Sequence, residues 1–209
     1  MIGLILLSYL CGSVPTAVWT GKVLKNIDVR EHGSGNAGAT NVYRVLGWKA
    51  ALFVVVIDVA KGFIPAFWFP NLLMQQPPAW AGLVAGICAV LGHVWTLLAG
   101  FRGGKGVGTS AGMLLALFPQ SMPFCLIVFA LVVGTTGYVS LASILATLTL
   151  PLSLLYFHFS GRTVVPLHLW LASVSLFLFI VFTHRSNLKR LVQGTEKSIR
   201  KKKSASTSI

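Results

Sequence analysis

The sequence predicts an all-α protein that crosses a membrane several times, and three observations lead to this fold class. Apolar residues make up 55% of the 209 residues and charged residues only 10%, whereas a soluble domain carries about 25% charged residues. Apolar stretches recur at about the 20-residue length that a helix needs to span a bilayer. The cationic residues gather in the connections between these stretches. We therefore expect a polytopic membrane protein of one domain.

Five stretches are clear candidates for spanning helices: residues 2–22, 49–69, 80–99, 139–157 and 167–183. The first stretch has no cationic start, unlike a secretory signal peptide, so we expect it to be retained. Residues 107–137 are 31 uncharged residues, too many for one span and few for two. Pro119 is expected to mark a tight turn between two short helices there. With that division the sequence predicts seven spans.

The cationic residues predict the orientation in the membrane. With the amino terminus outside and seven spans, 15 of the 17 lysines and arginines fall in the cytoplasm, as the positive-inside bias requires. The net charge of +13 therefore indicates membrane orientation and not nucleic-acid binding. Residues 1–194 are expected to form the membrane domain. Residues 195–209 are expected to form a disordered basic cytoplasmic tail that is attracted to anionic lipid.

The first polar cluster covers residues 33–41, and Arg44 follows three positions later. Its glycines allow backbone N–H groups to turn inward, and its hydroxyl and amide side chains add donors, which suits a phosphate. The cluster also fits the dinucleotide pattern G-x-G-x-x-G, but no strand pattern precedes it, so nucleotide binding is rejected. The candidate residues are Gly33, Ser34, Gly35, Asn36, Gly38, Thr40, Asn41 and Arg44.

The second polar cluster, residues 102–110, places glycines and a lysine at the expected start of a helix. It does not match a P-loop, but glycine amides and a lysine at a helix start form a positive cradle for phosphate. The alternative is an ordinary cytoplasmic turn; the first cluster on the same face favours the cradle. The candidate residues are Gly103, Gly104, Lys105, Gly106 and Thr109.

The third polar cluster, residues 183–191, closes the last span on the same face. His184 could act as a general base or as a donor to phosphate, and Asn187 lies on the same helical face, three residues on. The alternative is a helix end whose basic side chains reach lipid head groups. The residues alone leave both readings open.

Several polar residues lie within the spans. Asp58 and Lys61 stand at i and i+3, and charges at mid-membrane cost roughly 2.5–3.5 kcal/mol each, so they either pair with each other or brace the polar site. His93 could donate to a bound phosphate or to a backbone carbonyl. Ser140 and Ser143 face one way and either reach the substrate or pack helices together.

The acidic residues and histidines form no metal-ligand set, and no G-x-S-x-G nucleophile motif is present. The sequence therefore predicts a phosphate-binding site without a metal, without a cofactor and without an obvious covalent nucleophile.

The three clusters, in this order, strongly resemble the motifs of the bacterial acyl-phosphate:glycerol-3-phosphate acyltransferases, the PlsY family. The resemblance rests on residues 33–44, 92–106 and 184–196 and covers nearly the whole chain. It implies a seven-span enzyme of the bacterial inner membrane with its active site on the cytoplasmic face. It also implies transfer of a fatty acyl group from acyl phosphate to the sn-1 hydroxyl of glycerol 3-phosphate. The products are lysophosphatidic acid and phosphate, in phospholipid biosynthesis.

The resemblance also implies roles for single residues. The first motif lies near the acyl phosphate, the second is associated with glycerol-phosphate binding, and the third includes Glu196 in a structural role. Gly137 stands where a basic residue is usual. The expected catalytic residues are Ser34, Arg44, Lys105, His184 and Asn187. The expected substrate-binding residues are Gly33, Gly35, Asn36, Gly38, Thr40, Asn41, His93, Gly103, Gly104, Gly106, Thr109, Ser140 and Ser143.

Two other function classes compete with this enzyme. A transporter of a phosphorylated solute would place its binding groups near the midplane, often in paired repeats, but the polar clusters lie at one face and no repeat is visible. A purely structural membrane protein leaves the three polar clusters unexplained. The expected partners are the two substrates and the lipid bilayer, and the enzyme is expected to be a monomer.

Overall fold

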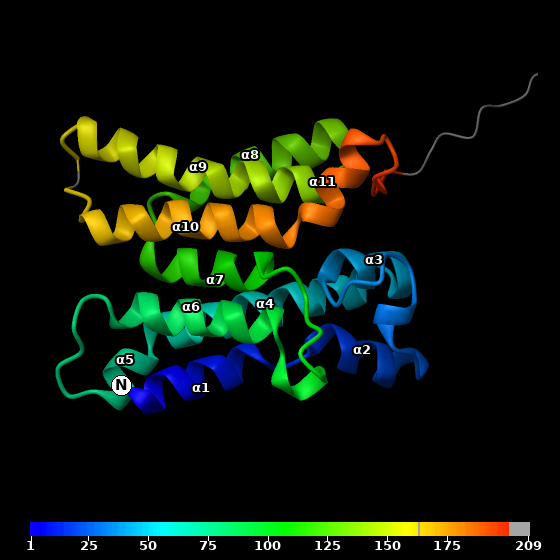
Figure 1. Cartoon of the computed structure of the whole chain (residues 1–209), viewed down its shortest axis with the longest axis horizontal. Coiled ribbons are helices and arrows are strands. Elements are labelled where there is room, and N and C mark those ends of the chain that lie inside the picture. The colour runs from blue at the N-terminus through cyan, green and yellow to red at the C-terminus, as the bar shows by residue number, and fades with distance from the viewer. Residues whose placement is uncertain (163, 201–209) are drawn as a thin grey trace, which may run out of the picture. The chain divides into compact units, whose positions relative to one another are not determined.

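The computed structural model describes residues 1–162 and 164–200, and no β-strand occurs among them. The predicted all-α fold class is thus confirmed for these residues (Figure 1). The helices are α1 (Ile2–Gly12), α2 (Thr16–Lys25), α3 (Ala39–Leu46), α4 (Trp48–Phe67), α5 (Phe69–Leu73), α6 (Ala81–Val94), α7 (Val107–Leu117), α8 (Met122–Thr136), α9 (Val139–Phe159), α10 (Leu167–Thr183) and α11 (Arg185–Val192), with 3-10 turns η1 (Val29–Glu31) and η2 (Leu97–Ala99).

Four helical segments of the described chain are long and apolar enough to cross a membrane, and α10 with α11 makes a fifth if this pair, bent by 62°, is one span. The four are Ile2–Lys25, Trp48–Phe67, Ala81–Ala99 and Val139–Phe159. Residues 107–137, which were expected to form two short helices, contain the two shorter apolar helices α7 and α8. The turn expected near Pro119 is confirmed, because α7 ends at Leu117 and α8 begins at Met122.

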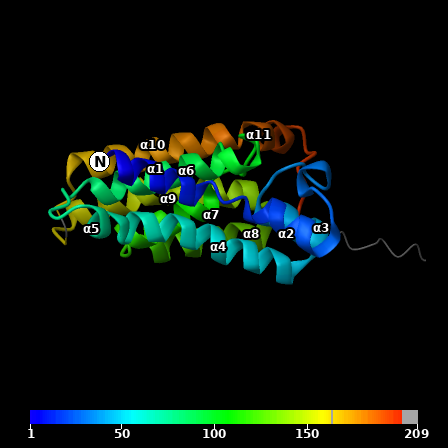
Figure 2. The ribbon, with the colours of Figure 1, turned by 90° about the horizontal axis from the view of Figure 1, so that it is seen from below.

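The first apolar stretch is not one continuous helix. α1 ends at Gly12 and α2 begins at Thr16, so Ser13, Val14 and Pro15 separate the two (Figure 2). Proline has no backbone N–H and disfavours a helical conformation at the residue before it, which explains the break. The break leaves backbone carbonyls inside an otherwise apolar segment, where other groups must satisfy them.

The chain forms two compact units, one covering Met1–Pro123 and one beginning at Phe124. In the first unit α4 packs against α6 and α7, and α1 packs against α6 (Figures 1 and 2). α4 and α7 approach closely at two glycines: a β-carbon on Gly62 would strike the Thr109 backbone, and one on Gly112 would strike the Val59 backbone. Small residues at helix interfaces are typical of membrane proteins, because they let backbones pack together.

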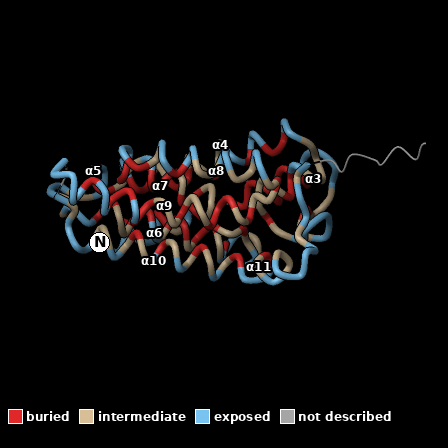
Figure 3. Tube along the Cα trace, turned by 90° about the horizontal axis from the view of Figure 1, so that it is seen from above, coloured by how far each residue is buried: buried red, intermediate tan, exposed pale blue. Residues whose placement is uncertain are grey.

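In the second unit α9 packs against α10 and α11, and Phe124 of α8 contacts Phe157 of α9 with ring centroids 5.8 Å apart. Buried residues recur along the helices of both units and alternate with exposed ones (Figure 3). Many exposed side chains are large and apolar, such as Leu126, Leu131 and Leu178. Such side chains suit contact with lipid rather than with water.

Candidate active site

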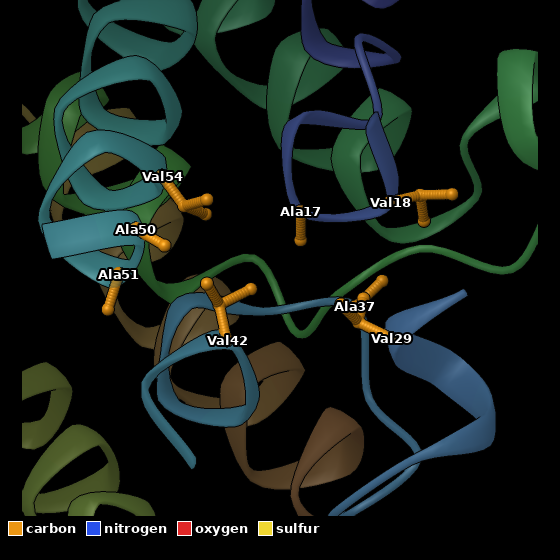
Figure 4. Packing of buried hydrophobic residues seen from close by; sticks show 8 residues of the cluster. All are labelled: Ala17, Val18, Val29, Ala37, Val42, Ala50, Ala51 and Val54. Atoms are coloured by element: carbon orange, nitrogen blue, oxygen red, sulfur yellow. The ribbon is translucent and has the colours of Figure 1, made fainter. Parts of the chain in front are cut away.

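The first predicted cluster begins in the connection between α2 and α3 and continues into α3. This connection, residues 26–38, is here called the first polar loop. After α2 ends, Asn26 adopts a left-handed conformation with φ of 53°, which turns the chain out of the helix. Apolar side chains from α2, α3, α4 and the loop then anchor it on the first unit (Figure 4). The residues of this anchor are Ala17, Val18, Val29, Ala37, Val42, Ala50, Ala51 and Val54.

Asn41 holds the first polar loop in shape. Its side-chain nitrogen donates to the carbonyls of Val29 and His32 at 2.7 and 3.0 Å. Its Oδ1 accepts from the Ser34 N–H at 2.7 Å and from the Ser34 hydroxyl at 3.1 Å. Asn41 is buried while Ser34 is exposed. The amide that was expected to bind substrate therefore shapes the loop that presents Ser34.

The remaining candidates of this cluster lie in the first polar loop and in α3. Asn36, Gly38, Thr40 and Arg44 are half-buried, and Arg44 lies in the last turn of α3. Gly33 and Gly35 have φ of 65° and 75°, in the left-handed region that favours glycine. The glycines of the predicted cluster therefore lie where the loop turns tightly, as the sequence pattern predicted.

The second predicted cluster lies between α6 and α7, in residues 95–106, here called the second polar loop. The N–H groups of Gly103 and Gly104 donate to the carbonyls of Val94 and His93 at 3.1 and 3.2 Å, which folds the loop back on the end of α6. Gly106 has φ of 85° and precedes α7. Lys105 is half-buried between these glycines. The N–H groups of Gly103 and Gly104 donate to carbonyls of the protein. These two glycines therefore shape the loop instead of offering their N–H groups to a phosphate.

The two polar loops meet at Gly104. A β-carbon on Gly104 would lie 2.9 Å from the Ala37 carbonyl oxygen of the first polar loop, and it would also strike the His93 imidazole. Glycine is the residue that permits such a close approach of two backbones. The first two predicted clusters are therefore brought together within the first unit.

Arg30 ties the same two loops a second time. Its Nη1 donates to the carbonyls of Ala99 and Arg102 at 2.7 and 3.1 Å. Asp28 orients this guanidinium, accepting from Nη2 at 2.7 Å and from Nε at 3.0 Å. The hydrogen bond from Arg30 holds the pKa of Asp28 below its usual value, and Asp28 in turn raises the pKa of Arg30.

Sequence reasoning missed this pair. Arg30 counted only as one cytoplasmic cation, and Asp28 had no role. One signal was available: Asp28 is one of only four acidic residues and stands two positions before an arginine, next to a phosphate-type cluster.

A buried ion pair lies beside the second polar loop. Asp58 Oδ1 is 2.8 Å from Lys61 Nζ and 3.7 Å from His93 Nδ1. Lys61 Nζ also donates to the Val14 carbonyl, at the break between α1 and α2, at 2.9 Å. All three charged or titratable side chains are 5–6% exposed. The first alternative for Asp58 and Lys61 is therefore confirmed, since the two pair with each other, and bracing of the polar site stays a prediction.

In the second unit the third cluster is organised by Glu196. Its Oε1 accepts from the Asn187 side chain at 2.6 Å and from the Ser140 hydroxyl at 2.8 Å, and its Oε2 accepts from Arg190 Nε at 2.7 Å. Burial acts to raise the pKa of Glu196, but the hydrogen bonds from Asn187, Ser140 and Arg190 outweigh it and lower the pKa. Glu196 belongs to the segment expected to be a tail, whose residues 201–209 lie outside the described residues.

His184 stands at the bend between α10 and α11 and is only 3% exposed. Its Nδ1 is 2.8 Å from the Ile180 carbonyl, and its own carbonyl accepts the Asn187 N–H at 2.8 Å. His184 and Asn187 are thus buried, Arg185 and Lys189 are exposed, and Arg190 pairs with Glu196. The role of His184 and Asn187 toward substrate stays a prediction.

The other candidates lie apart from these contacts. Ser143 is buried, and its hydroxyl donates to the Val139 carbonyl of its own helix at 2.8 Å. Thr109 is fully buried at the α4–α7 interface. Gly137, with φ of 74°, lies against the chain after Glu196, where Arg200 Nη1 donates to the Thr135 carbonyl at 2.7 Å.

The expected catalytic residues are divided between the units. Ser34, Arg44 and Lys105 belong to the first unit, and His184 and Asn187 belong to the second.

A family model described as glycerol-3-phosphate acyltransferase matches residues 2–194. Among curated relatives, the glycerol-3-phosphate acyltransferase of Chlorobaculum parvum is 43% identical, with 93% of this chain and 94% of the relative covered. The enzyme of the same name from Chlorobium luteolum is 41% identical, with 98% and 99% covered. These matches extend over all three polar clusters.

Two solved structures are also similar. Both are crystal structures of PlsY, an integral membrane glycerol 3-phosphate acyltransferase, one in its glycerol 3-phosphate form and one in its lysophosphatidic acid form. They align with TM-scores of 0.81 and 0.80 at 34% sequence identity, and 95% of each chain is covered. The motifs, the fold and the similarity over the full length agree, and this chain belongs to the glycerol-3-phosphate acyltransferase family.

Proposed function

We propose that this protein transfers a fatty acyl group from acyl phosphate to the sn-1 hydroxyl of glycerol 3-phosphate, producing lysophosphatidic acid and phosphate. One observation carries the proposal. Two glycine-rich loops, one followed by Arg44 and one containing Lys105, meet at Gly104 and are tied by Arg30. Two cationic loops in contact suit a reaction in which two phosphate-bearing substrates must approach each other.

The chemistry asks little of the protein besides positioning and charge. The sn-1 hydroxyl oxygen attacks the acyl carbonyl carbon, the bond from that carbon to the phosphate oxygen breaks, and phosphate leaves. The departing phosphate accepts the hydroxyl proton, so no metal or cofactor is required. Arg44 and Lys105 stabilise the negative charge of the phosphates and of the transition state. The exposed Ser34 hydroxyl adds a donor when it exchanges its bond to Asn41 Oδ1 for one to a phosphate.

The other predicted residues receive supporting tasks. His184 and Asn187 orient the attacking hydroxyl, which the burial of both side chains supports. The glycines let the loops approach the phosphates closely. Asn36 and Thr40 add donors beside Ser34. Residues 1–194 act as the membrane domain. Residues 195–209 carry the basic charge expected of a tail, but Glu196 among them belongs to the third cluster.

The proposed topology has seven crossings, with the amino terminus outside and the active site on the cytoplasmic face of the bacterial inner membrane. The support is the positive-inside count of the sequence together with the two short apolar helices α7 and α8. The proposed enzyme is a monomer. Cysteine labelling from one side of intact cells, at positions near Trp80 and near Arg102, tests the topology.

The first experiment measures phosphate release by purified protein given acyl phosphate and glycerol 3-phosphate, with chelator present. Release that requires glycerol 3-phosphate and resists the chelator is expected. Lys105→Ala should lower kcat/KM by about 100-fold, as loss of one charge-stabilising donor does. Lys49→Ala removes an exposed lysine of α4 and serves as the matched control.

Two outcomes would overturn parts of this proposal. Activity with acyl-CoA but not with acyl phosphate would refute the donor. Folded protein that is inactive with both donors, but exchanges glycerol 3-phosphate across liposomes, would make it a transporter.

A further inference from the structure

The buried groups Asp58, Lys61 and His93 lie behind the second polar loop, and the reaction chemistry gives them no task. We propose that they are positioning residues, which hold the second polar loop, and with it Lys105, in the form that binds glycerol 3-phosphate. This inference rests on the proposed function and adds to it which buried residues set the affinity for the acceptor substrate.

The first step is the link between Lys61 and the broken first span. Val14 precedes Pro15, and its carbonyl lies at the break between α1 and α2. Lys61 Nζ donates to this carbonyl at 2.9 Å, and the Thr16 N–H donates to it at 3.0 Å. The lysine of α4 therefore satisfies the break and fixes the start of α2 relative to α4.

The second step is the link between Asp58 and the second polar loop. Asp58 Oδ1 lies 2.8 Å from Lys61 Nζ and 3.7 Å from His93 Nδ1. The carbonyl of His93 accepts the Gly104 N–H at 3.2 Å, and a β-carbon on Gly104 would strike the imidazole. Any shift of His93 is therefore transmitted directly to the residue that precedes Lys105.

Asp58 also contacts the helix that follows the loop. A β-carbon on Gly108, in the first turn of α7, would lie 3.0 Å from the Asp58 Cβ. The same aspartate thus lies against the chain both before and after Lys105, through His93 with Gly104 and through Gly108. The loop between these two points is held at both ends.

A small cavity marks the place where all these parts meet. It has a volume of about 10 Å³ and is lined by Asp58, Lys61, His93, Ala37 and Gly104, among others. That is near the least volume that holds one water molecule. Residues of the ion pair and of both polar loops therefore line one small space.

The energetics of a buried ion pair indicate that the pair fixes the position of the loop more than it stabilises the fold. Desolvation of two charges offsets most of their attraction, so replacing a buried pair by apolar residues of similar volume is often neutral or stabilising. Removing one partner, in contrast, leaves an uncompensated buried charge and is strongly destabilising. Comparing the stability of single and paired variants therefore distinguishes a positioning role from a stabilising role.

The test uses the paired variant Asp58→Leu with Lys61→Met, which removes both charges together. The unfolding temperature should fall only modestly, because the Val14 carbonyl loses its Lys61 donor but keeps the Thr16 N–H. The KM for glycerol 3-phosphate should rise by about tenfold or more, while the KM for acyl phosphate changes by less than about threefold. His93→Phe, which keeps a ring but no polar atom, should raise the same KM.

A readout without turnover accompanies the kinetics. Glycerol 3-phosphate should raise the unfolding temperature of the unchanged protein, and it should do so far less for the paired variant. Leu4→Ala is the matched control, because Leu4 is a buried residue at the other end of α1 that packs on Ala81 and Ala85. It should lower stability and leave the KM for glycerol 3-phosphate unchanged.

The outcomes separate this inference from the proposed function. An active enzyme whose paired variant keeps its KM for glycerol 3-phosphate would refute the positioning role and leave the function intact. A paired variant that fails to fold would refute it too, since the pair would then be needed for stability. An unchanged protein that neither turns over nor binds glycerol 3-phosphate would refute the proposed function itself.

Discussion

The two units build their polar regions in opposite ways. In the first unit two backbone loops are held against each other by glycines, by backbone carbonyls and by Arg30. In the second unit a single carboxylate, Glu196, gathers side chains from α9 and α11. The first arrangement has no room for added atoms, whereas the second depends on one charge. Each region should therefore fail under a different kind of substitution.

The largest effect is expected from adding one methyl group in the first unit. Gly104→Ala places a β-carbon against the His93 imidazole and 2.9 Å from the Ala37 carbonyl oxygen, so the two loops must separate. We expect kcat/KM to fall by about 100-fold or more, equivalent to about 2.7 kcal/mol. Gly3→Ala, with open space at the added carbon, is the control. A fully active Gly104→Ala enzyme would show that the loops need not meet there.

The next effect comes from removing charge in the second unit. Glu196→Gln keeps the shape but weakens the bonds from Asn187, Ser140 and Arg190. Because hydrogen bonds to a charged group contribute about 1.5–3 kcal/mol, the free energy of unfolding should fall by about that amount. Denaturant unfolding measures it, with the exposed Glu31→Gln as control. Equal stability of both variants would remove Glu196 from the centre of this network.

A smaller effect is expected from the tie between the loops. Arg30→Met removes the donors to the Ala99 and Arg102 carbonyls but keeps part of the side-chain length. The contact at Gly104 remains, so we expect a rise of only about threefold to tenfold in the KM for glycerol 3-phosphate. Steady-state kinetics test this, with Arg162→Met, in the α9–α10 connection, as the control. A loss as large as that of Gly104→Ala would make Arg30 the main tie.

The smallest effect is the response of stability to pH. The folded-state pKa values of Asp28 and Glu196 are both lowered. Their contribution is therefore complete above the usual values of 3.8 and 4.5 and is lost as the pH falls through the lowered folded values. Unfolding temperatures should fall below about pH 4, and less so in Glu196→Gln. A variant with the same pH profile as the unchanged protein would contradict this origin.

The sequence predicted the tight turns of the first two polar clusters because these turns are local in the chain, whereas phosphate binding there stays a prediction. Glycines, hydroxyls and cations within residues 33–44 and 102–109 indicate tight turns and phosphate binding without any long-range contact. The turn near Pro119 was predictable for the same reason, since proline acts on its immediate neighbours. The tasks of single side chains were less predictable. Asn41 and Ser140 looked like donors to substrate, and both donate to groups of the protein.

By itself the sequence determined an all-α membrane protein and the positions of three polar clusters, and it predicted the side of the membrane for its cations. Only the tertiary structure decided that Gly104 lies against Ala37, that Arg30 ties the loops, and that Lys61 satisfies the broken first span at Val14. The physical reason is the separation in sequence over which each kind of interaction acts. Turn chemistry and hydropathy act between neighbours in the chain, whereas these contacts join residues far apart in sequence and depend on how closely the helices pack.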